Sequence, residues 1–391
     1  MATYTETHRW ITFQLDLSQA PFEFWVLAGE ALSKCEHLAG VALRPEAARR
    51  LMEVYLAKGV QATTAIEGNT LTEEQVLERI QGTLELPPSK AYLGVEVDNI
   101  IAACNEIGKQ YVAGELPSIA PDLICGFNEH VLRNLQLDEQ VRPGKVRTYS
   151  VGVADYRGAP AGDLSELLRK LCDWLAQPWL EQLDCYQKHD LQRLEAILKA
   201  VIAHLYLAWI HPFGDGNGRT ARLLEFYILV GAGVPFPAAH LLSNHYNQTR
   251  SEYYRQLSQA SKSGGKVIPF CKYALRGFVD QLREQILAVR KEQLELFWQN
   301  NVHKTLGESE TGRRRTHVVL DLTTAAKPVP KDKMTDVSPR VARDYARKDE
   351  KTLLRDLAKL ERLELIVKEE DGYRAKTEVV LAYLVPGRRR T

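Results

Sequence analysis

The sequence predicts a mainly α-helical fold with one β-hairpin among the helices and a small helix–helix–hairpin unit near the C-terminal end. Three observations support this fold class. Apolar residues recur at helical spacing through most of residues 47–299. The segment Gln140–Ala161 interrupts that spacing with three glycines and two prolines, and it holds the alternating run Val146–Val153. Residues 338–375 then read as two helices followed by a short hairpin.

The helices of the N-terminal and central parts are predicted from apolar periodicity and from signals at their ends. Pro121 suits the first turn of a helix, and Gly114 closes the helix before it. Asp190–Ile210 is apolar on most sides, so we expect it to be the buried central helix. The expected helices are Ala47–Val60, Thr72–Gln81, Leu93–Val112, Pro121–Leu135, Leu164–Ala176, Asp190–Ile210, Arg219–Val230, Glu252–Ser261 and Phe270–Gln299.

The C-terminal part is expected to be a winged-helix domain. Ser338 suits an N-cap, with Pro339 in the first turn of a helix that runs through Ala346. A second helix, Glu350–Leu363, has leucines at core spacing. The two hairpin strands are expected at Ile366–Lys368 and Tyr373–Ala375, around a turn at Asp371–Gly372.

The domain boundaries are predicted from composition. Lys304–Arg315 is polar and charged and contains two glycines, so we interpret this stretch as a linker. We expect an N-terminal helical region over residues 1–115, a central core over 116–300, a linker over 301–316 and the winged helix over 317–391.

Composition and charge place the chain among ordinary globular proteins. Its 391 residues carry a net charge of only +1, so the whole chain has no strong attraction to nucleic acid or to a membrane. The charge is uneven: Lys304–Thr391 carries 21 basic and 15 acidic side chains, and the preceding part is net acidic. A basic end behind an acidic body indicates two roles, with chance unevenness of solvated surfaces as the alternative.

The cysteines and the hydropathy indicate a cytoplasmic protein. Met1–Gln14 has no apolar signal core, and no stretch approaches the ~20 apolar residues of a membrane span. Six scattered cysteines without a CxxC pair read as free thiols in a reducing compartment: Cys35, Cys104, Cys125, Cys172, Cys185 and Cys271.

The segment His211–Arg222 carries the chemistry. It reads HPFGDGNGRTAR, with a glycine-dense loop after an apolar helix and a new helix beginning near Asn217 or Gly218. Glycines let backbone N–H groups converge, and the unpaired N–H groups of a helix N-terminus attract anions. This arrangement predicts a cradle for phosphate.

The side chains of the same segment add the other groups that phosphoryl or nucleotidyl transfer needs. Arg219 and Arg222 share one helix face and suit phosphate oxygens. Asp215 is a hard oxygen ligand suited to Mg²⁺, and His211 is a candidate base. There is no Walker A loop. The alternative, a core histidine before an ordinary helix–helix turn, explains a lone His-Pro-Phe better than it explains the complete run.

The run resembles HxFx(D/E)GNGRxxR, the signature of the Fic family, with every specified position filled. The resemblance covers residues 50–295. It implies a Fic-type helical bundle with a β-hairpin flap, and transfer of AMP from ATP to a Tyr, Ser or Thr hydroxyl of a target protein. It also implies that His211 is the catalytic base, that Asp215 holds Mg²⁺, and that Phe213 anchors the loop. The implied nucleotide-binding set is Phe213, Gly214, Gly216, Asn217, Gly218, Arg219 and Arg222.

Residues 63–69, TTAIEGN, resemble the inhibitory motif of the same family, S/T-x-x-x-E-G/N. Thr63, Glu67 and Gly68 fill its specified places, in a helix at about residues 60–70 that precedes the core. The resemblance implies that Glu67 pairs with Arg222 in place of the ATP γ-phosphate. The alternative is an ordinary helix end with a solvated Glu67.

Further contacts and functions are expected from position alone. Val146–Pro160 lies where the family has its target-docking flap, although a partnerless surface hairpin is the alternative. Tyr246 and Asn247, with Asn244, Tyr253 and Tyr254, lie where relatives contact adenine and ribose. The competing functions are the same chemistry with UMP or phosphocholine, removal of AMP, and DNA-binding regulation through the winged helix. For DNA we single out Arg340, Arg343, Arg347 and Lys348, interspersed with acidic residues. A homodimer is a further possible partner.

Overall fold

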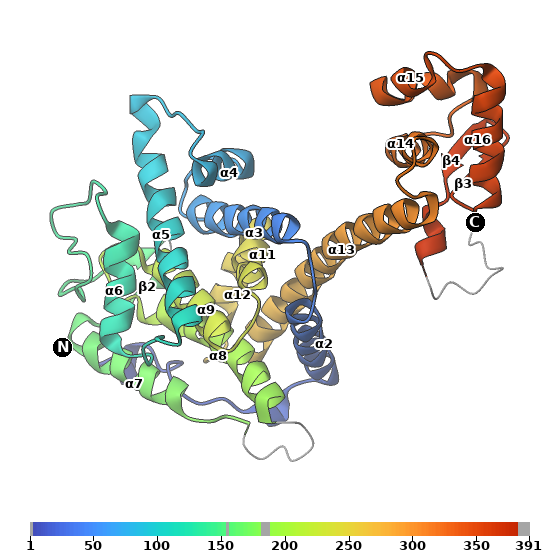
Figure 1. Cartoon of the computed structure of the whole chain (residues 1–391). Coiled ribbons are helices and arrows are strands. Elements are labelled where there is room, and N and C mark those ends of the chain that lie inside the picture. The colour runs from blue at the N-terminus through green and yellow to red at the C-terminus, as the bar shows by residue number, and fades with distance from the viewer. Residues whose placement is uncertain (1–2, 154–155, 181–187, 382–391) are drawn as a thin grey trace. The chain divides into compact units, whose positions relative to one another are not determined.

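The computed structural model describes residues 3–153, 156–180 and 188–381, and its elements form two compact units (Figure 1). The first unit spans Met1–Ile286 and the second Leu287–Thr391. Both are mainly helical, as predicted, and each described two-stranded antiparallel sheet belongs to one of them.

The first unit is a bundle of helices with a short hairpin. Its strands β1 (Gly152–Val153) and β2 (Tyr156–Arg157) pair antiparallel. Its α-helices are α1 (Tyr4–Thr7), α2 (Phe22–Ala39), α3 (Pro45–Ala65), α4 (Glu73–Gln81), α5 (Ala91–Ala113), α6 (Pro121–Leu132), α7 (Leu164–Ala176), α8 (Lys188–Ile210), α9 (Asn217–Gly231), α10 (Phe236–Ala239), α11 (Leu241–Gln248), α12 (Arg250–Lys262) and the first half of α13 (Ile268–Leu306). Short 3₁₀ turns lie at Leu17–Gln19, Pro88–Lys90 and Ala161–Asp163.

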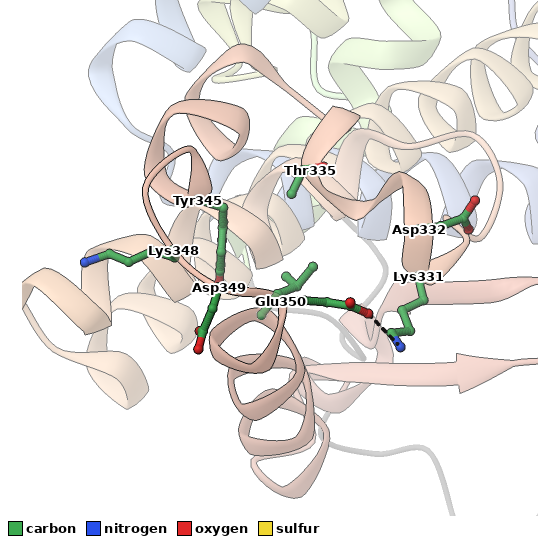
Figure 2. A pocket seen from close by; sticks show the side chains of 8 residues that line it. Lys331, Asp332, Thr335, Tyr345, Lys348, Asp349 and Glu350 are labelled. Carbon is green, nitrogen blue, oxygen red and sulfur yellow. Dashed lines mark ion pairs between the residues drawn. The ribbon is translucent and has the colours of Figure 1, made fainter.

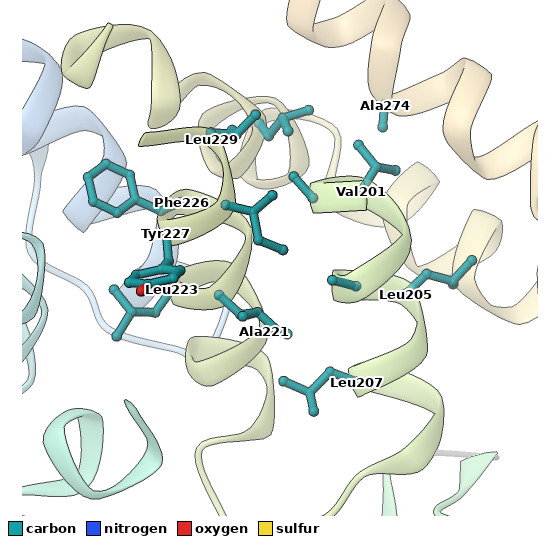
Figure 3. Close-up of a cluster of buried hydrophobic side chains, with 14 of the residues drawn as sticks. Val201, Leu205, Leu207, Ala221, Leu223, Phe226, Tyr227, Leu229 and Ala274 are labelled. Atoms are coloured by element: carbon teal, nitrogen blue, oxygen red, sulfur yellow. The ribbon is translucent and has the colours of Figure 1, made fainter. Parts of the chain in front are cut away.

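Helices α8 and α9 form the centre of the first unit, as their apolar sequences predict. They pack along each other, and Leu207 of α8 and Ala221 of α9 point toward one another (Figure 3). The described side chains of α9 are almost all buried. A helix that is apolar all round is stable only inside a core, and this burial fixes the loop between α8 and α9.

The second unit holds the rest of α13, helices α14 (Glu310–Thr324), α15 (Pro339–Tyr345) and α16 (Glu350–Arg362), and the hairpin β3 (Ile366–Glu369)–β4 (Gly372–Ala375). Short 3₁₀ turns lie at Lys331–Asp336 and Thr377–Val380. Ser338 caps α15 by accepting from the Val341 N–H, as its sequence predicts. The order of helices and hairpin is the one expected of a winged helix, which stays a prediction.

The structure differs from the sequence predictions in three places. Residues 301–316, expected as a linker, hold the end of α13 and the start of α14. Only a few side chains of these two helix segments, such as Val302 and Val319, are buried in the core. The apolar periodicity of the sequence is therefore weak there. Residues 1–115 cluster with the core instead of forming a separate region. The hairpin is shorter than the alternating run Val146–Val153, and residues 154–155 of the expected flap lie outside the described residues.

Candidate active site

The loop His211–Gly216 joins the two central helices and is held in one conformation by hydrogen bonds. Phe213 N–H donates to Asn217 Oδ1, and Asn217 Nδ2 donates back to the Phe213 carbonyl, both at 2.9 Å. The Phe213 ring is fully buried, as an anchor of the loop should be. Asn128 Nδ2 donates to the Asp215 carbonyl at 2.9 Å from α6. The Asn217 side-chain amide thus braces the loop, and the predicted role of Asn217 at the anion site stays a prediction.

The glycines of the loop are required by close approaches. Gly216 has φ +75°, a left-handed conformation that glycine adopts without strain, and it is the N-cap of α9. A side chain at Gly214 would collide with the Tyr149 hydroxyl. Helix α9 begins without a side-chain cap, so no N-cap side chain occupies its first N–H groups. The phosphate cradle at these N–H groups stays a prediction.

His211 lies at the end of α8, in a backbone conformation with φ +52° that is rare for a residue with a side chain. Arg147 stabilises this turn: its Nε donates to the His211 carbonyl at 2.8 Å and its backbone N–H donates to the Pro212 carbonyl at 2.9 Å. Burial lowers the pKa of His211 to about 4, and the positive charge of Arg147 contributes to this shift. The imidazole is therefore neutral at physiological pH and able to accept a proton.

Glu67 occupies the space in front of the cradle. Its Oε1 lies 2.5 Å from Arg222 Nη2, and a Cβ at Gly218 would collide with the same oxygen. Arg222 also donates to the Thr63 carbonyl at 3.0 Å. Burial raises the pKa of Glu67, but Arg222, Arg219 and His211 together outweigh it and lower the net pKa. An ionised carboxylate thus lies at the N-terminal end of α9.

The two side chains of the Glu67–Arg222 ion pair differ in their exposure to solvent. The Arg222 side chain is 1% exposed, whereas that of Glu67 is 33% exposed. The carboxylate therefore faces water on one side, and Arg222 approaches it from the core. Gly68 follows with φ +104°, a conformation that glycine adopts without strain.

Arg219 belongs to a second polar cluster that sequence reasoning missed. Its guanidinium lies 3.4 Å from Glu96 Oε1 and 3.5 Å from Asp215 Oδ2. Glu96 Oε2 accepts in turn from Asn69 Nδ2 at 2.8 Å. Asn69 is buried two residues after Glu67, so the cluster connects the segment behind Glu67 to α5 and α9. The one signal in the sequence was a charged Glu96 within the apolar stretch of α5.

Asp215 is the residue at this site suited to a divalent cation. Its side chain is half exposed, and its Oδ1 accepts from the Gly216 N–H at 2.5 Å. No cluster of three or more His, Cys, Asp or Glu in the described ranges is able to hold a metal. Mg²⁺ is commonly held by one or two carboxylates together with substrate phosphates, so a single accessible carboxylate beside a phosphate cradle fits that ion.

Two of the five residues expected to contact adenine or ribose, Asn247 and Tyr246, lie in different surroundings. Asn247 is half-buried, and its Nδ2 donates to Gln61 on α3 at 3.2 Å. Tyr246 is completely buried, and its hydroxyl donates to Glu225 of α9 at 2.9 Å. Tyr246 therefore supports α9 from the core, which is a correction to its expected place at an open nucleotide site.

A separate hollow of about 530 Å³ lies in the second unit (Figure 2). It shares no residue with the His211–Arg222 segment, and charges of both signs line it, with Lys331 and Glu350 paired at 3.3 Å. Its lining holds neither a histidine nor a glycine loop like that of the His211–Arg222 segment, so we assign the chemistry to the first unit. In the described part of the chain, no helix is both long and apolar enough for a membrane span.

Comparison with known proteins gives the same assignment. Residues 118–229 match the Fic/DOC family. The chain is 29% identical over 268 residues to protein adenylyltransferase fic-1 of Caenorhabditis elegans, covering 68% of this chain and 48% of that protein. It is 31% identical over 244 residues to the Caenorhabditis briggsae protein of the same name, with coverages of 62% and 44%. The chain thus spans about half the length of the curated relatives it matches.

Solved structures agree on the fold. A Fic family protein from Desulfovibrio desulfuricans G20 aligns over 96% of this chain and all of its own, with a TM-score of 0.55 and 20% identity. Residues 134–508 of Fic-1 from C. elegans align over 68% of this chain and 74% of that one, with a TM-score of 0.52 and 26% identity. Residues 118–229 thus carry a Fic domain, in agreement with the filled signature and with these folds.

Proposed function

We propose that the protein transfers AMP from ATP to a Tyr, Ser or Thr hydroxyl of a target protein, and that Glu67 holds it in an inhibited state. The observation that carries both parts is the Glu67 carboxylate at the N-terminal end of α9, bonded to Arg222. A site that attracts one anion at a helix N-terminus beside an arginine also attracts a phosphate. The names of the curated relatives support adenylyl transfer.

His211 is proposed as the base. A hydroxyl is a weak nucleophile until a proton acceptor lies beside it, and the lowered pKa of His211 keeps its ring unprotonated. The α9 N-terminus and Arg222 stabilise charge that develops on the phosphates and on the leaving pyrophosphate. Asp215 would hold Mg²⁺, which supplies further positive charge to the phosphate oxygens.

The hairpin is proposed to position the target. Gly158 packs against His211, since a Cβ there would lie 2.8 Å from the His211 Cβ. Ala159 N–H donates to the Ile210 carbonyl at 3.2 Å, which ties the strand after the turn to the end of α8. A target segment that pairs with the hairpin as an added strand would therefore lie close to the base. A homodimer and DNA binding by the winged helix also remain proposals, and neither depends on the transfer site.

The inhibition follows from charge competition. Glu67 and a triphosphate cannot both neutralise Arg222, so the carboxylate must leave before phosphate binds in the same place. Arg250 holds the segment in front of Glu67, because its Nη2 donates to the Ile66 carbonyl at 2.6 Å. Removal of the Glu67 side chain should free Arg222 without disturbing that backbone.

The test is labelled AMP incorporation by Glu67→Ala, with the protein itself and a cell lysate as acceptors. We expect clear labelling by Glu67→Ala, little by the unmodified chain, and none when His211→Ala is added. Glu53→Ala is the matched control, since Glu53 lies on α3, the helix that precedes Glu67, and accepts from Gln81. Adding Gly218→Ala to Glu67→Ala should abolish labelling again, because the new methyl fills the vacated space. Equal labelling by all variants would contradict the proposal. Labelling from UTP or CDP-choline but not from ATP would show that the donor is not ATP.

A further inference from the structure

The second unit presents a basic helix face that the transfer reaction does not use. Helix α16 has four exposed basic side chains, Lys351, Arg355, Lys359 and Arg362. At about 100° per residue they fall within roughly 80° of one another around the helix axis. Within the described ranges, none of the four forms an ion pair. The exposed Ala358 lies in the same arc and leaves room for a partner surface to approach.

The core side of α16 explains why this face points outward. Leu353, Leu357 and Leu360 are buried in the core of the second unit. Between them, the buried Asp356 accepts from Arg314 at 2.9 Å and from Arg315 at 2.7 Å. The Tyr345 hydroxyl donates to the same carboxylate at 2.9 Å. These bonds fix the rotation of α16 against α14 and α15.

Many other basic residues of the unit are neutralised by neighbours. Arg340 pairs with Asp321, Lys348 with Glu310, and Arg374 with Glu369 and Glu378. Arg340 and Lys348 are two of the four residues that the sequence singled out for DNA. Among the described residues, the α16 face therefore replaces those four residues, which lie in α15 and the turn after it, as the largest cluster of basic side chains without an ion pair.

The surrounding geometry favours duplex DNA as the partner. Helix α15, the turn Ala346–Asp349 and α16 form a helix–turn–helix, in which the second helix is the one that enters a major groove. The basic residues extend over about 16 Å at 1.5 Å per residue, and a helix fits the ~12 Å width of that groove. The hairpin tip carries exposed acidic residues, Glu370 and Asp371, so the surface is confined to the helix.

We propose that the α16 face binds double-stranded DNA, with Lys351, Arg355, Lys359 and Arg362 on its phosphates and base edges. The site is independent of nucleotide transfer and lies in a different compact unit. Binding is expected to be strongly salt-dependent, because each neutralised phosphate releases counterions.

The experiment compares two fourfold variants of the full chain with the same loss of charge. The first replaces Lys351, Arg355, Lys359 and Arg362 by alanine, and the second replaces Arg340, Arg343, Arg347 and Lys348. Binding to a labelled mixed-sequence duplex of about 20 base pairs is measured by anisotropy at 50 and 200 mM salt. Circular dichroism confirms that each variant is folded, and Arg355→Glu alone is a milder second variant.

We expect the α16 variant to lose at least tenfold in affinity for the duplex at low salt. The variant at Arg340, Arg343, Arg347 and Lys348 should lose less than threefold. The slope of log K against log salt should fall by about 0.9 for each phosphate that the variant no longer neutralises. Equal losses in the two variants, or no duplex binding by the unmodified chain at 50 mM salt, would overturn the proposal. The proposal would also be overturned if polyglutamate displaced the labelled duplex as effectively as unlabelled duplex does. That result would assign the face to an acidic protein surface.

Discussion

The pair of Glu67 and Arg222 is the contact on which the proposed inhibition depends, and a double-mutant cycle measures its strength. The variants are Glu67→Ala, Arg222→Ala and the two together. In Glu67→Ala the buried guanidinium keeps its bond to the Thr63 carbonyl but loses its counter-charge. The free energy of unfolding of Glu67→Ala should therefore be lower than that of the unmodified chain. The loss is limited because the deleted carboxylate is partly exposed.

The magnitude follows from the one-sided burial. Removing one partner of a fully buried ion pair costs about 3–5 kcal/mol, and exposed pairs contribute about 0.2–1 kcal/mol. With Arg222 buried and a third of Glu67 in water, we expect a coupling energy of about 1–2 kcal/mol. Domains of 150–250 residues lose about 2–4 °C per kcal/mol, so the Tm of the larger first unit, Met1–Ile286, should fall by at most about 8 °C.

The assay is thermal unfolding of each variant by calorimetry, with and without ATP. ATP should raise the Tm of Glu67→Ala more than that of the unmodified chain. Its phosphates would supply the negative charge that Arg222 loses with the Glu67 carboxylate. Glu53→Ala is the control and should unfold with the unmodified chain. Additivity of the two single variants within about 0.5 kcal/mol would show that the pair is uncoupled and would refute the reasoning.

Three other predictions follow from the packing and the charges. Gly59→Ala should destabilise the first unit by about 1–3 kcal/mol, because a methyl there collides with the His240 ring; Gly29→Ala, with no neighbour in reach, should be neutral or stabilising in the same unfolding measurement. Arg147→Lys should lower both Tm and the activity of the Glu67→Ala enzyme, because lysine lacks the fork that bonds to three carbonyls; unchanged values of both would contradict its positioning role. The transfer rate should stay level from pH 8 to about 5.5 and fall toward pH 4, because the lowered pKa of His211 keeps the base unprotonated until then; a midpoint at pH 6.5 would contradict this.

The central helices and the catalytic loop could be predicted from the sequence because their signals are local. Apolar residues on most sides indicated burial of α8 and α9, and the glycines of the loop indicated a helix N-terminus free for anions. The pairing of Glu67 with Arg222 was implied by the family resemblance, and the structure brings the two together. Its observed geometry depends on the tertiary packing of α3 against α9.

The missed features are those that depend on distant segments. Arg147 reads as one basic residue in a loop, yet its role comes from carbonyls at Tyr149, Ala159 and His211. Tyr246 reads as a ligand contact near the motif, but tertiary packing turns it toward Glu225. Helix α14 has a polar sequence, so periodicity alone could not distinguish it from a linker.

The paired bonds between Phe213 and Asn217 have a consequence for how the proposed nucleotide would bind. Because the loop is already closed on itself, binding requires no folding of that segment and no loss of its conformational entropy. Affinity is then governed by the displacement of one side chain and not by disorder. Amide hydrogen exchange at residues 213–218 should accordingly be slow before any nucleotide is added, and nucleotide should change it little.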